Sequence, residues 1–104
     1  MYQALETQQL RKAAGRRSAF EVMMDVLRSV ANGDSKPTHI MYRSNTSWLI
    51  LQRCLAALEA SQFVTSVDFG QRSGYEATEK GRGVLHDYLR LVESTSGQPV
   101  EAVQ

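Results

Sequence analysis

The feature that most constrains this chain is a single change of hydrophobic period near residue 63. Before this point the apolar residues recur at the three- and four-residue spacing of amphipathic helices. Residues 63–67 are instead rich in β-branched and aromatic side chains, which favour a strand. Gly70 and Gly74 then bracket a turn, and residues 75–77 can return as the partner strand. The sequence therefore predicts one β-hairpin in an otherwise helical chain, whose 104 residues suit one small domain.

A first helix is predicted over residues 18–31. Ser18 and Glu21 have the spacing of a capping box, in which each side chain bonds a backbone N–H at the helix start. Asn32 and Gly33 should end the helix, since both tolerate the left-handed conformation found at helix C-termini. The stripe expected to face the core consists of Phe20, Met23, Met24, Leu27 and Val30.

Two more helices are predicted before the hairpin. Pro37 suits the first turn of a short helix. The polar residues 44–47 offer caps for a longer helix over residues 46–61, from which Gln52 and Arg53 point away from the apolar stripe. On this longer helix we interpret Cys54 as a small buried hydrophobe. The stripe expected to be buried consists of Trp48, Leu51, Cys54, Leu55 and Leu58.

The last helix is predicted to begin at Thr78 and to stop near Glu93. Gly81 and Gly83 should weaken its first turns by about 1 kcal/mol each relative to Ala. Its apolar residues cover an arc of about 160°, wider than the roughly 100° that one packing face requires. Either a second subunit packs on the part of this apolar surface that the domain's own core does not need, as in the common two-fold homodimers, or the N-terminal arm folds back over that part. The residues predicted to form a dimer contact are Val84, Tyr88 and Leu91.

These elements divide the chain into three parts. Residues 1–17 hold few large apolar side chains and are expected to form a flexible basic arm. Residues 18–93 form the folded domain together with the dimerisation helix. Residues 94–104 are small and polar, and are expected to form a disordered tail. The basic cluster of the arm consists of Arg11, Lys12, Arg16 and Arg17.

A net charge near zero conceals an uneven distribution of charge along the chain. Twelve Lys and Arg face 11 Asp and Glu, a formal net charge of +1. Residues 11–53 hold eight of the cations and three of the acids, a balance of +5, whereas residues 54–104 hold four cations and seven acids, a balance of −3. A positive face would suit an anionic partner, and chance fluctuation accounts for the same bias about equally well.

Several function classes have no support in the sequence. One Cys is too little for a disulfide or a thiolate metal cluster, and no Ser has a credible His and Asp constellation. The pair Gly81 and Gly83 lacks the rest of a phosphate-binding loop. The longest apolar run, residues 48–51, is far too short to span a membrane, and we see no signal peptide. We therefore expect no enzyme activity, no cofactor or metal, no small-molecule substrate and no membrane, with a cytoplasmic location.

The order of elements predicts a winged helix-turn-helix. This fold class is mainly α with a small β-hairpin, in the order helix, helix, helix, hairpin, helix. In such folds the second helix of the pair, here residues 46–61, enters the major groove of DNA. The hairpin, here residues 63–77, acts as a wing that can reach phosphates or the minor groove.

Two blocks of sequence add a family resemblance. The run KPTHIMYRSNTSWLILQRCLAAL, followed by YEATEKGRGVLHDYLRL, resembles the small archaeal winged-helix proteins that include DNA-binding regulators and chromatin-associated factors. The resemblance covers residues 18–92 and implies a recognition helix, a wing and a dimerising last helix. Departures are Thr46, where the family usually has Leu, Cys54, where an aromatic residue is common, and a shorter last helix. The matching residues are Thr38, Ile40, Met41, Tyr42, Asn45, Ser47, Trp48, Leu51, Leu55, Leu58, Tyr75, Thr78 and Gly81.

We therefore predict a dimeric protein that binds double-stranded DNA, either a transcriptional regulator or a nucleoid-associated factor. Arg53 could bind guanine and Gln52 adenine through paired hydrogen bonds, while cations elsewhere contact phosphates. The alternative is a protein-interaction module without DNA binding, in which exposed Leu49 and Ile50 form an apolar docking patch. The candidate DNA-binding residues are Lys36, His39, Arg43, Ser44, Asn45, Ser47, Gln52, Arg53, Gln71 and Arg72.

Overall fold

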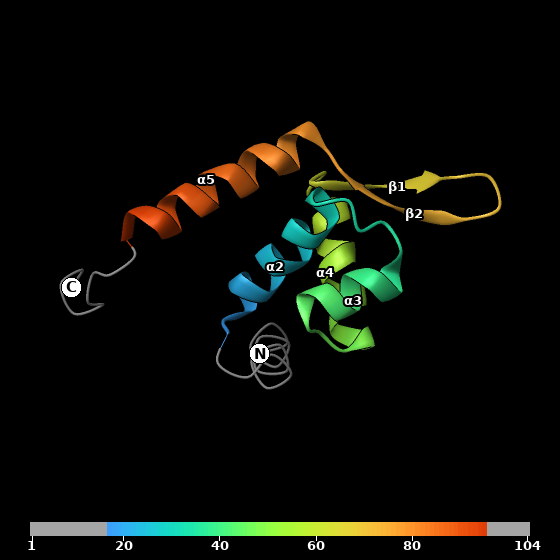
Figure 1. The fold of residues 1–104 in the computed structure, drawn as a ribbon, viewed down its shortest axis with the longest axis horizontal. Helices are drawn as coiled ribbons and strands as arrows, with labels where there is room; N and C mark the ends of the chain where they lie inside the picture. The colour runs from blue at the N-terminus through green and yellow to red at the C-terminus, as the bar shows by residue number, and fades with distance from the viewer. Residues whose placement is uncertain (1–16, 96–104) are drawn as a thin grey trace.

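A computed structural model describes residues 17–95 as four helices and one two-stranded antiparallel sheet (Figure 1). Helices α2, α3 and α4 form one packed unit, the hairpin projects from it, and α5 runs back from the base of the hairpin past α2. The predicted fold class and element order are confirmed. In chain order the elements are α2 (Ala19–Ala31), α3 (Pro37–Ser44), α4 (Trp48–Ala60), β1 (Val64–Asp68), β2 (Ser73–Ala77) and α5 (Glu79–Thr95).

The predicted arm and tail fall almost wholly outside the described residues. Arg17 is the exception at the first end: it belongs to the folded domain, so the predicted arm is at least one residue too long. Ser94 and Thr95 are the exception at the other end, since both are helical and continue α5 beyond the predicted stop near Glu93. No helix within residues 17–95 is both long and apolar enough to cross a membrane.

Helix α2 begins and ends close to the predicted residues. The Ser18 hydroxyl accepts the N–H of Glu21 at 3.1 Å, and the Glu21 carboxylate accepts the N–H of Ser18 at 3.2 Å. The capping box predicted from the spacing is therefore formed. After Ala31 the chain turns toward α3 through Gly33, whose φ of 106° lies in the region that favours glycine.

The buried face of α2 differs from the predicted stripe. Val22 and Val26 are fully buried, whereas Phe20 is 56% exposed and Met23 is half-buried. The prediction that Phe20 faces the core is therefore wrong. Helix α2 contacts α3, α4, β2 and α5, so it is buried on more than one side, and a single stripe does not describe its packing.

The helix-turn-helix pair consists of α3 and α4. Pro37 is the first residue of α3, as predicted, and Asn45 ends this helix in the left-handed conformation with φ 55° and ψ 54°. The Ser47 hydroxyl accepts the N–H of Ile50 at 3.3 Å and so caps α4. The longer helix is thus confirmed at residues 48–60, slightly shorter than the predicted 46–61.

Strand β1 has the predicted length but is shifted by one residue, whereas β2 begins two residues earlier than predicted, because the turn is confined to residues 69–72. The register pairs Val64 with Ala77 and Asp68 with Ser73. Strand β2 is also bonded on its other edge, since the N–H of Tyr75 donates to the carbonyl of Ser35 at 3.0 Å. This bond fixes the hairpin against the loop that leads into α3.

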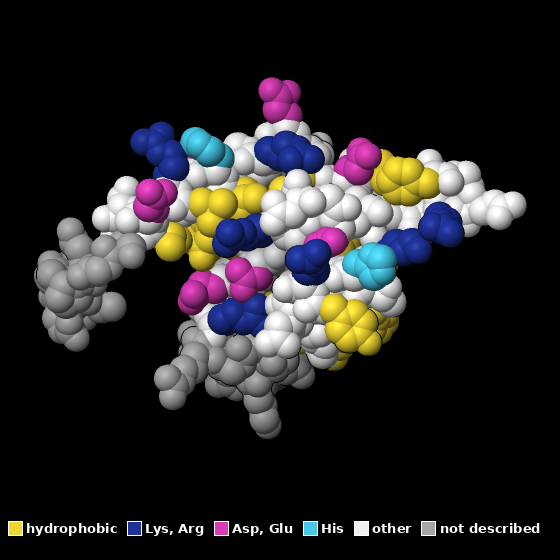
Figure 2. Space-filling view, viewed as in Figure 1, with side chains coloured by type: hydrophobic (Ala, Val, Ile, Leu, Met, Phe, Trp, Pro, Cys, Tyr) yellow, Lys and Arg dark blue, Asp and Glu magenta, His cyan; other side chains and the backbone are white. Residues whose placement is uncertain are grey.

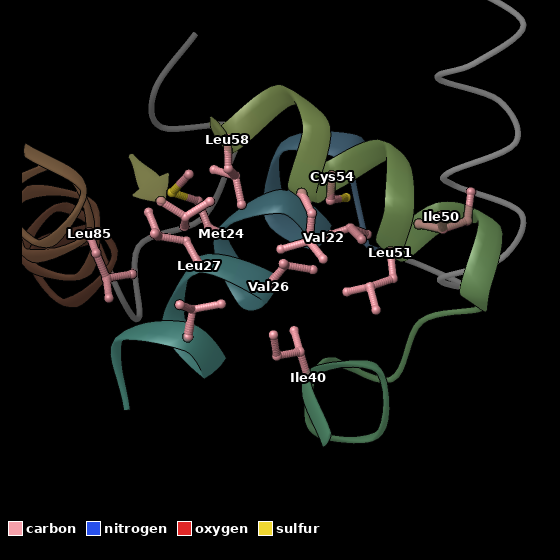
Figure 3. Packing of buried hydrophobic residues seen from close by; sticks show 13 residues of the cluster. Val22, Met24, Val26, Leu27, Ile40, Ile50, Leu51, Cys54, Leu58 and Leu85 are labelled. Atoms are coloured by element: carbon pink, nitrogen blue, oxygen red, sulfur yellow. The ribbon is translucent and has the colours of Figure 1, made fainter. Parts of the chain in front are cut away.

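One core joins all four helices and the first strand (Figure 3). Leu27 from α2, Ile40 from α3 and Leu51 from α4 are fully buried at its centre, and Leu85 closes it from α5. Cys54 is buried as predicted, and burial raises the pKa of its thiol to about 11, against an opposing effect of the Arg17 charge. Trp48 is 48% exposed, so its predicted place in the core is wrong.

Helix α5 begins where the chain returns to the foot of β1. The Thr78 hydroxyl donates to the carbonyl of Gln62 at 2.6 Å and accepts the N–H of Gly81 at 2.9 Å. Gly81 is buried because the backbone at Phe63 passes directly over it. Nothing lies within 4 Å of the position of a Cβ atom at Gly83. The two glycines, treated alike in the sequence, therefore have different surroundings.

Candidate nucleic-acid interface

The open face of α4 is a continuous strip along the helix. At about 100° per residue, its exposed positions span an arc of roughly 120°, with Gln52 and Ala56 near the middle. Arg53 lies at one edge of this arc and is half-buried. No side chain of the described chain covers the strip, so the helix is presented as the helix-turn-helix prediction requires. The exposed residues are Trp48, Leu49, Gln52, Ala56, Glu59 and Ala60.

A shallow groove runs between α4 and the wing. Trp48 and Pro37 stand at one end of it, Tyr75 of β2 forms the wing side, and Gln52 lies along the helix side. At its far end the Glu59 carboxylate accepts the hydroxyl of Ser66 at 2.8 Å. Because this bond joins α4 to β1, the helix and the wing are held as one surface.

Arg17 holds the turn between α3 and α4. Its guanidinium donates to the carbonyls of Ser44 and Asn45 and to the carboxylate of Asp25 on α2, each at 2.7 Å. Carbonyls at the end of a helix lack partners within the helix, and a cation satisfies them. Arg17 thus positions the start of α4 from a distance of almost thirty residues in sequence. The sequence analysis missed this role because it assigned Arg17 to the arm.

Ser44 does not fit its predicted role as a DNA contact. Its side chain is 2% exposed, and its hydroxyl donates to the carbonyl of Ile40 within α3. Asn45 and Ser47 are exposed on either side of the turn. Ser47 serves as the cap of α4 and lies at the helix N-terminus, where side chains and free N–H groups suit a phosphate.

Three predicted phosphate-contacting residues share one face of α3 and its N-cap. Lys36, His39 and Arg43 recur at i, i+3 and i+7, within about 60° of arc. His39 and Arg43 are exposed and Lys36 is half-buried. Arg43 lies 3.7 Å from the Asp34 carboxylate, which already accepts the Ser29 hydroxyl at 2.8 Å. The charge of Arg43 is therefore partly neutralised, although 75% of its side chain remains exposed.

The wing adds a further cation to this side of the molecule. Arg72 and Gln71 are exposed in the turn, where the N–H of Phe69 donates to the Arg72 carbonyl at 2.7 Å and Gly70 has a φ of 82°. Figure 2 shows Lys, Arg and His side chains following one another from the hairpin across α3. Among the predicted phosphate-contacting residues, His39 and Arg43 thus lie on α3, Lys36 at its N-cap and Arg72 on the wing.

An apolar surface lies between α5 and the start of α2. Tyr88 and Phe20 meet edge to face with ring centroids 5.4 Å apart, and Leu91 and Val92 continue the surface with exposures of 63% and 45%. Figure 2 shows this hydrophobic area between the two helices. Burial, followed by the charges of Glu21 and Asp25, raises the pKa of Tyr88.

The predicted dimerisation residues therefore divide into two kinds. Val84 is half-buried against the domain's own core, and its contact with a second subunit stays a prediction. Tyr88 is also half-buried, and Leu91 is open. Phe20 and Val92 were not predicted as part of this surface. The exposed arc of α5 could have suggested Val92, but nothing in the sequence indicated that Phe20 would be left open.

The residues that support the rival docking patch are also divided. Leu49 is 55% exposed, whereas Ile50 is 3% exposed and belongs to the core. The prediction that Ile50 is exposed is therefore wrong. Among residues 17–95, no group of three or more His, Cys, Asp or Glu could hold a metal ion.

The comparisons with known proteins agree with this fold. The family model described as "Winged helix-turn-helix" matches residues 16–96. A curated relative from the archaeon Methanocaldococcus jannaschii, the uncharacterized protein MJ0287, is 26% identical over 84 residues, which cover 81% of this chain and 82% of the relative.

Solved structures show the same architecture. The DNA-binding protein Sso10a-2 from Sulfolobus solfataricus matches with a TM-score of 0.58 and 24% identity, over 75% of this chain and 84% of that chain. FabT from Streptococcus pneumoniae, solved in complex with DNA, matches with a TM-score of 0.61 and 17% identity, over 96% of this chain and 76% of that chain. The fold, its turn and its wing, together with the family match over most of the chain, show that this protein belongs to the winged helix-turn-helix family.

Proposed function

We propose that this protein is a DNA-binding protein of the transcription-regulator type. The observation that carries the proposal is the open face of α4, which lies beside the wing across a groove lined by Gln52 and Tyr75. In the comparisons, Sso10a-2 is named as a DNA-binding protein and FabT as a protein in complex with DNA. We propose a role as a transcriptional regulator or a nucleoid-associated factor in the cytoplasm, without enzyme activity.

In this proposal α4 enters the major groove and the cations of its neighbours bind phosphates. Lys36, His39 and Arg43 on α3 and Arg72 on the wing neutralise the DNA backbone. Gln52 contacts base edges from the middle of the open face, and Arg53 contacts a base or a phosphate from its edge. Asn45, Ser47 and Gln71 supply further polar contacts at the turn and at the wing tip.

We further propose that the protein acts as a homodimer. The surface formed by Phe20, Tyr88, Leu91 and Val92 is apolar and open along two helices. A second copy of the same surface would bury it across a two-fold axis. Two recognition helices would then contact two half-sites of one duplex.

The test is a titration of the full chain with a mixed-sequence duplex at several salt concentrations, followed by fluorescence anisotropy. The logarithm of the affinity should fall linearly with the logarithm of the salt concentration, with a slope of about −0.9 per phosphate contacted. The double variant Lys36→Gln, Arg72→Gln should weaken binding and reduce the slope by about two phosphate contacts. Arg90→Gln, which removes a charge from the exposed side of α5, is the matched control. Binding that is absent, or insensitive to salt, would refute the proposal.

A protein-interaction module remains the second candidate, and exposed Trp48 and Leu49 favour it. The burial of Ile50 halves the patch on which this candidate depends. The same titration separates the two functions, since a docking module would not bind the duplex at moderate salt.

A further inference from the structure

The middle of the open face of α4 carries no charge. Gln52 and Ala56 occupy it, with Trp48 on one side and Leu49 on the other. Arg53, the cation of this helix, lies half-buried at the edge. The acid of the helix, Glu59, lies near its C-terminal end and accepts the Ser66 hydroxyl. The N-terminal half of the face, which contacts base edges in helix-turn-helix proteins, is therefore apolar around one amide.

This chemistry is selective among base pairs. In the major groove guanine presents two acceptors, which favour Arg or Lys as donors, whereas adenine presents an acceptor and a donor that match an amide. Thymine adds a methyl group, which apolar side chains contact. An amide flanked by Leu49, Ala56 and Trp48 thus complements an adenine with thymines around it better than it complements a G·C pair.

The surroundings of the face fit the same partner. The groove beside it is lined by Leu51, Leu55 and Tyr75 of the wing together with the polar side chains of Gln52 and Glu59. Cations lie on the neighbouring elements, with Lys36 at the N-cap of α3 and Arg72 in the turn of the hairpin. An uncharged face with cations on neighbouring elements suits a groove, where bases lie between two rows of phosphates.

We infer that α4 selects A·T pairs in the major groove by contacting thymine methyl groups through Leu49, Ala56 and Trp48, with Gln52 bonding adenine. This inference rests on the proposed DNA binding and names the class of DNA sequence that the protein prefers. Loss of one buried methyl group should weaken binding about four-fold.

The test compares duplexes that differ only in that methyl group. An A·T-rich duplex and the same duplex with deoxyuridine in place of thymidine present identical hydrogen-bonding groups, so their affinity ratio isolates the methyl contact. The deoxyuridine duplex should bind at least about four-fold more weakly. In a G·C-rich duplex, 5-methylcytosine in place of cytosine should strengthen binding, because it places a methyl group in the same groove.

Variants assign the effect to α4. Leu49→Gln should lower the thymidine-to-deoxyuridine ratio while leaving the salt dependence unchanged. Arg90→Gln, an exposed change on α5 away from this face, should keep the ratio of the unmodified protein. Equal affinity for the thymidine and deoxyuridine duplexes would overturn the inference and leave the proposed DNA binding intact. Binding to neither duplex would overturn both.

Discussion

Gly81 and Gly83 lie two residues apart in α5, and alanine at these positions should change stability in opposite directions. In an open helical position Gly costs about 1 kcal/mol relative to Ala. Nothing lies within 4 Å of a Cβ atom at Gly83. Gly83→Ala should therefore raise the free energy of unfolding by up to about 1 kcal/mol, which raises Tm by about 4–8 °C in a domain of this size.

At Gly81 the gain in helix preference from alanine is opposed by a clash with the backbone of Phe63. A Cβ atom there would lie 2.8 Å from the carbonyl carbon of Phe63 and would overlap its oxygen. That oxygen accepts the N–H of Thr78 at 2.9 Å, so relief of the overlap would disturb the bond that starts α5. Overpacking costs about 1–3 kcal/mol and the bond about 1 kcal/mol. After the gain in helix preference, Gly81→Ala should destabilise the domain by about 1–3 kcal/mol.

Urea and thermal denaturation followed by circular dichroism measure both variants against the unmodified chain. The two changes are chemically identical and differ only in what the new methyl group meets. If both alanines stabilise the domain to a similar extent, the close contact between the Phe63 backbone and Gly81 of α5 is refuted. Destabilisation by both would show that the helix start needs glycine for a reason other than this contact.

Three further predictions follow from single side chains. Arg17→Ala should lower the free energy of unfolding by about 1–3 kcal/mol, because three charge-assisted bonds at the turn are lost; a urea midpoint unchanged in Arg17→Ala would contradict this. Burial raises the pKa of Cys54 from 9.0 to about 11. The stability that the protonated thiol contributes to the fold is therefore fully present below pH 9 and is lost as the pH rises to 11. Cys54→Ala should flatten the fall in the free energy of unfolding over this pH range, and parallel profiles for the variant and the unmodified chain would refute the prediction. Leu91→Asp places a charge on the exposed apolar surface of α5 and should shift the sedimentation coefficient toward the value of a monomer. A dimer that persists unchanged in this variant would exclude this surface of α5 from the dimer contact.

Local signals in the sequence predicted the elements well. The capping box at Ser18, the proline at the start of α3 and the capping Ser47 each act over a few residues. The two serines make their expected cap bonds, and Pro37 is the first residue of α3. The change of period near residue 63 likewise fixed the hairpin. Such signals depend on neighbours in the chain, which the sequence displays directly.

Long-range packing accounts for what the sequence did not predict. Phe20 and Trp48 have the spacing of core residues but lie near helix ends and are about half exposed, and Phe20 packs only against Tyr88 at the surface among the ring contacts of the described residues. Arg17 appeared to belong to a basic arm, yet its partners Ser44 and Asn45 are almost thirty residues away. Gly81 was expected to be a weakness, and only the path of the chain at Phe63 explains its presence. Each of these needs the three-dimensional arrangement of helices.

The most direct test of the whole account is a nuclear magnetic resonance titration of the full chain with an A·T-rich duplex. The account predicts that the largest changes in amide shift fall in the N-terminal half of α4, in the turn around Asn45, along α3 and at the wing tip near Arg72. Changes confined to α5 and Phe20, with the amides of Gln52 and Ala56 unaffected, would contradict the claim that the open face of α4 meets DNA.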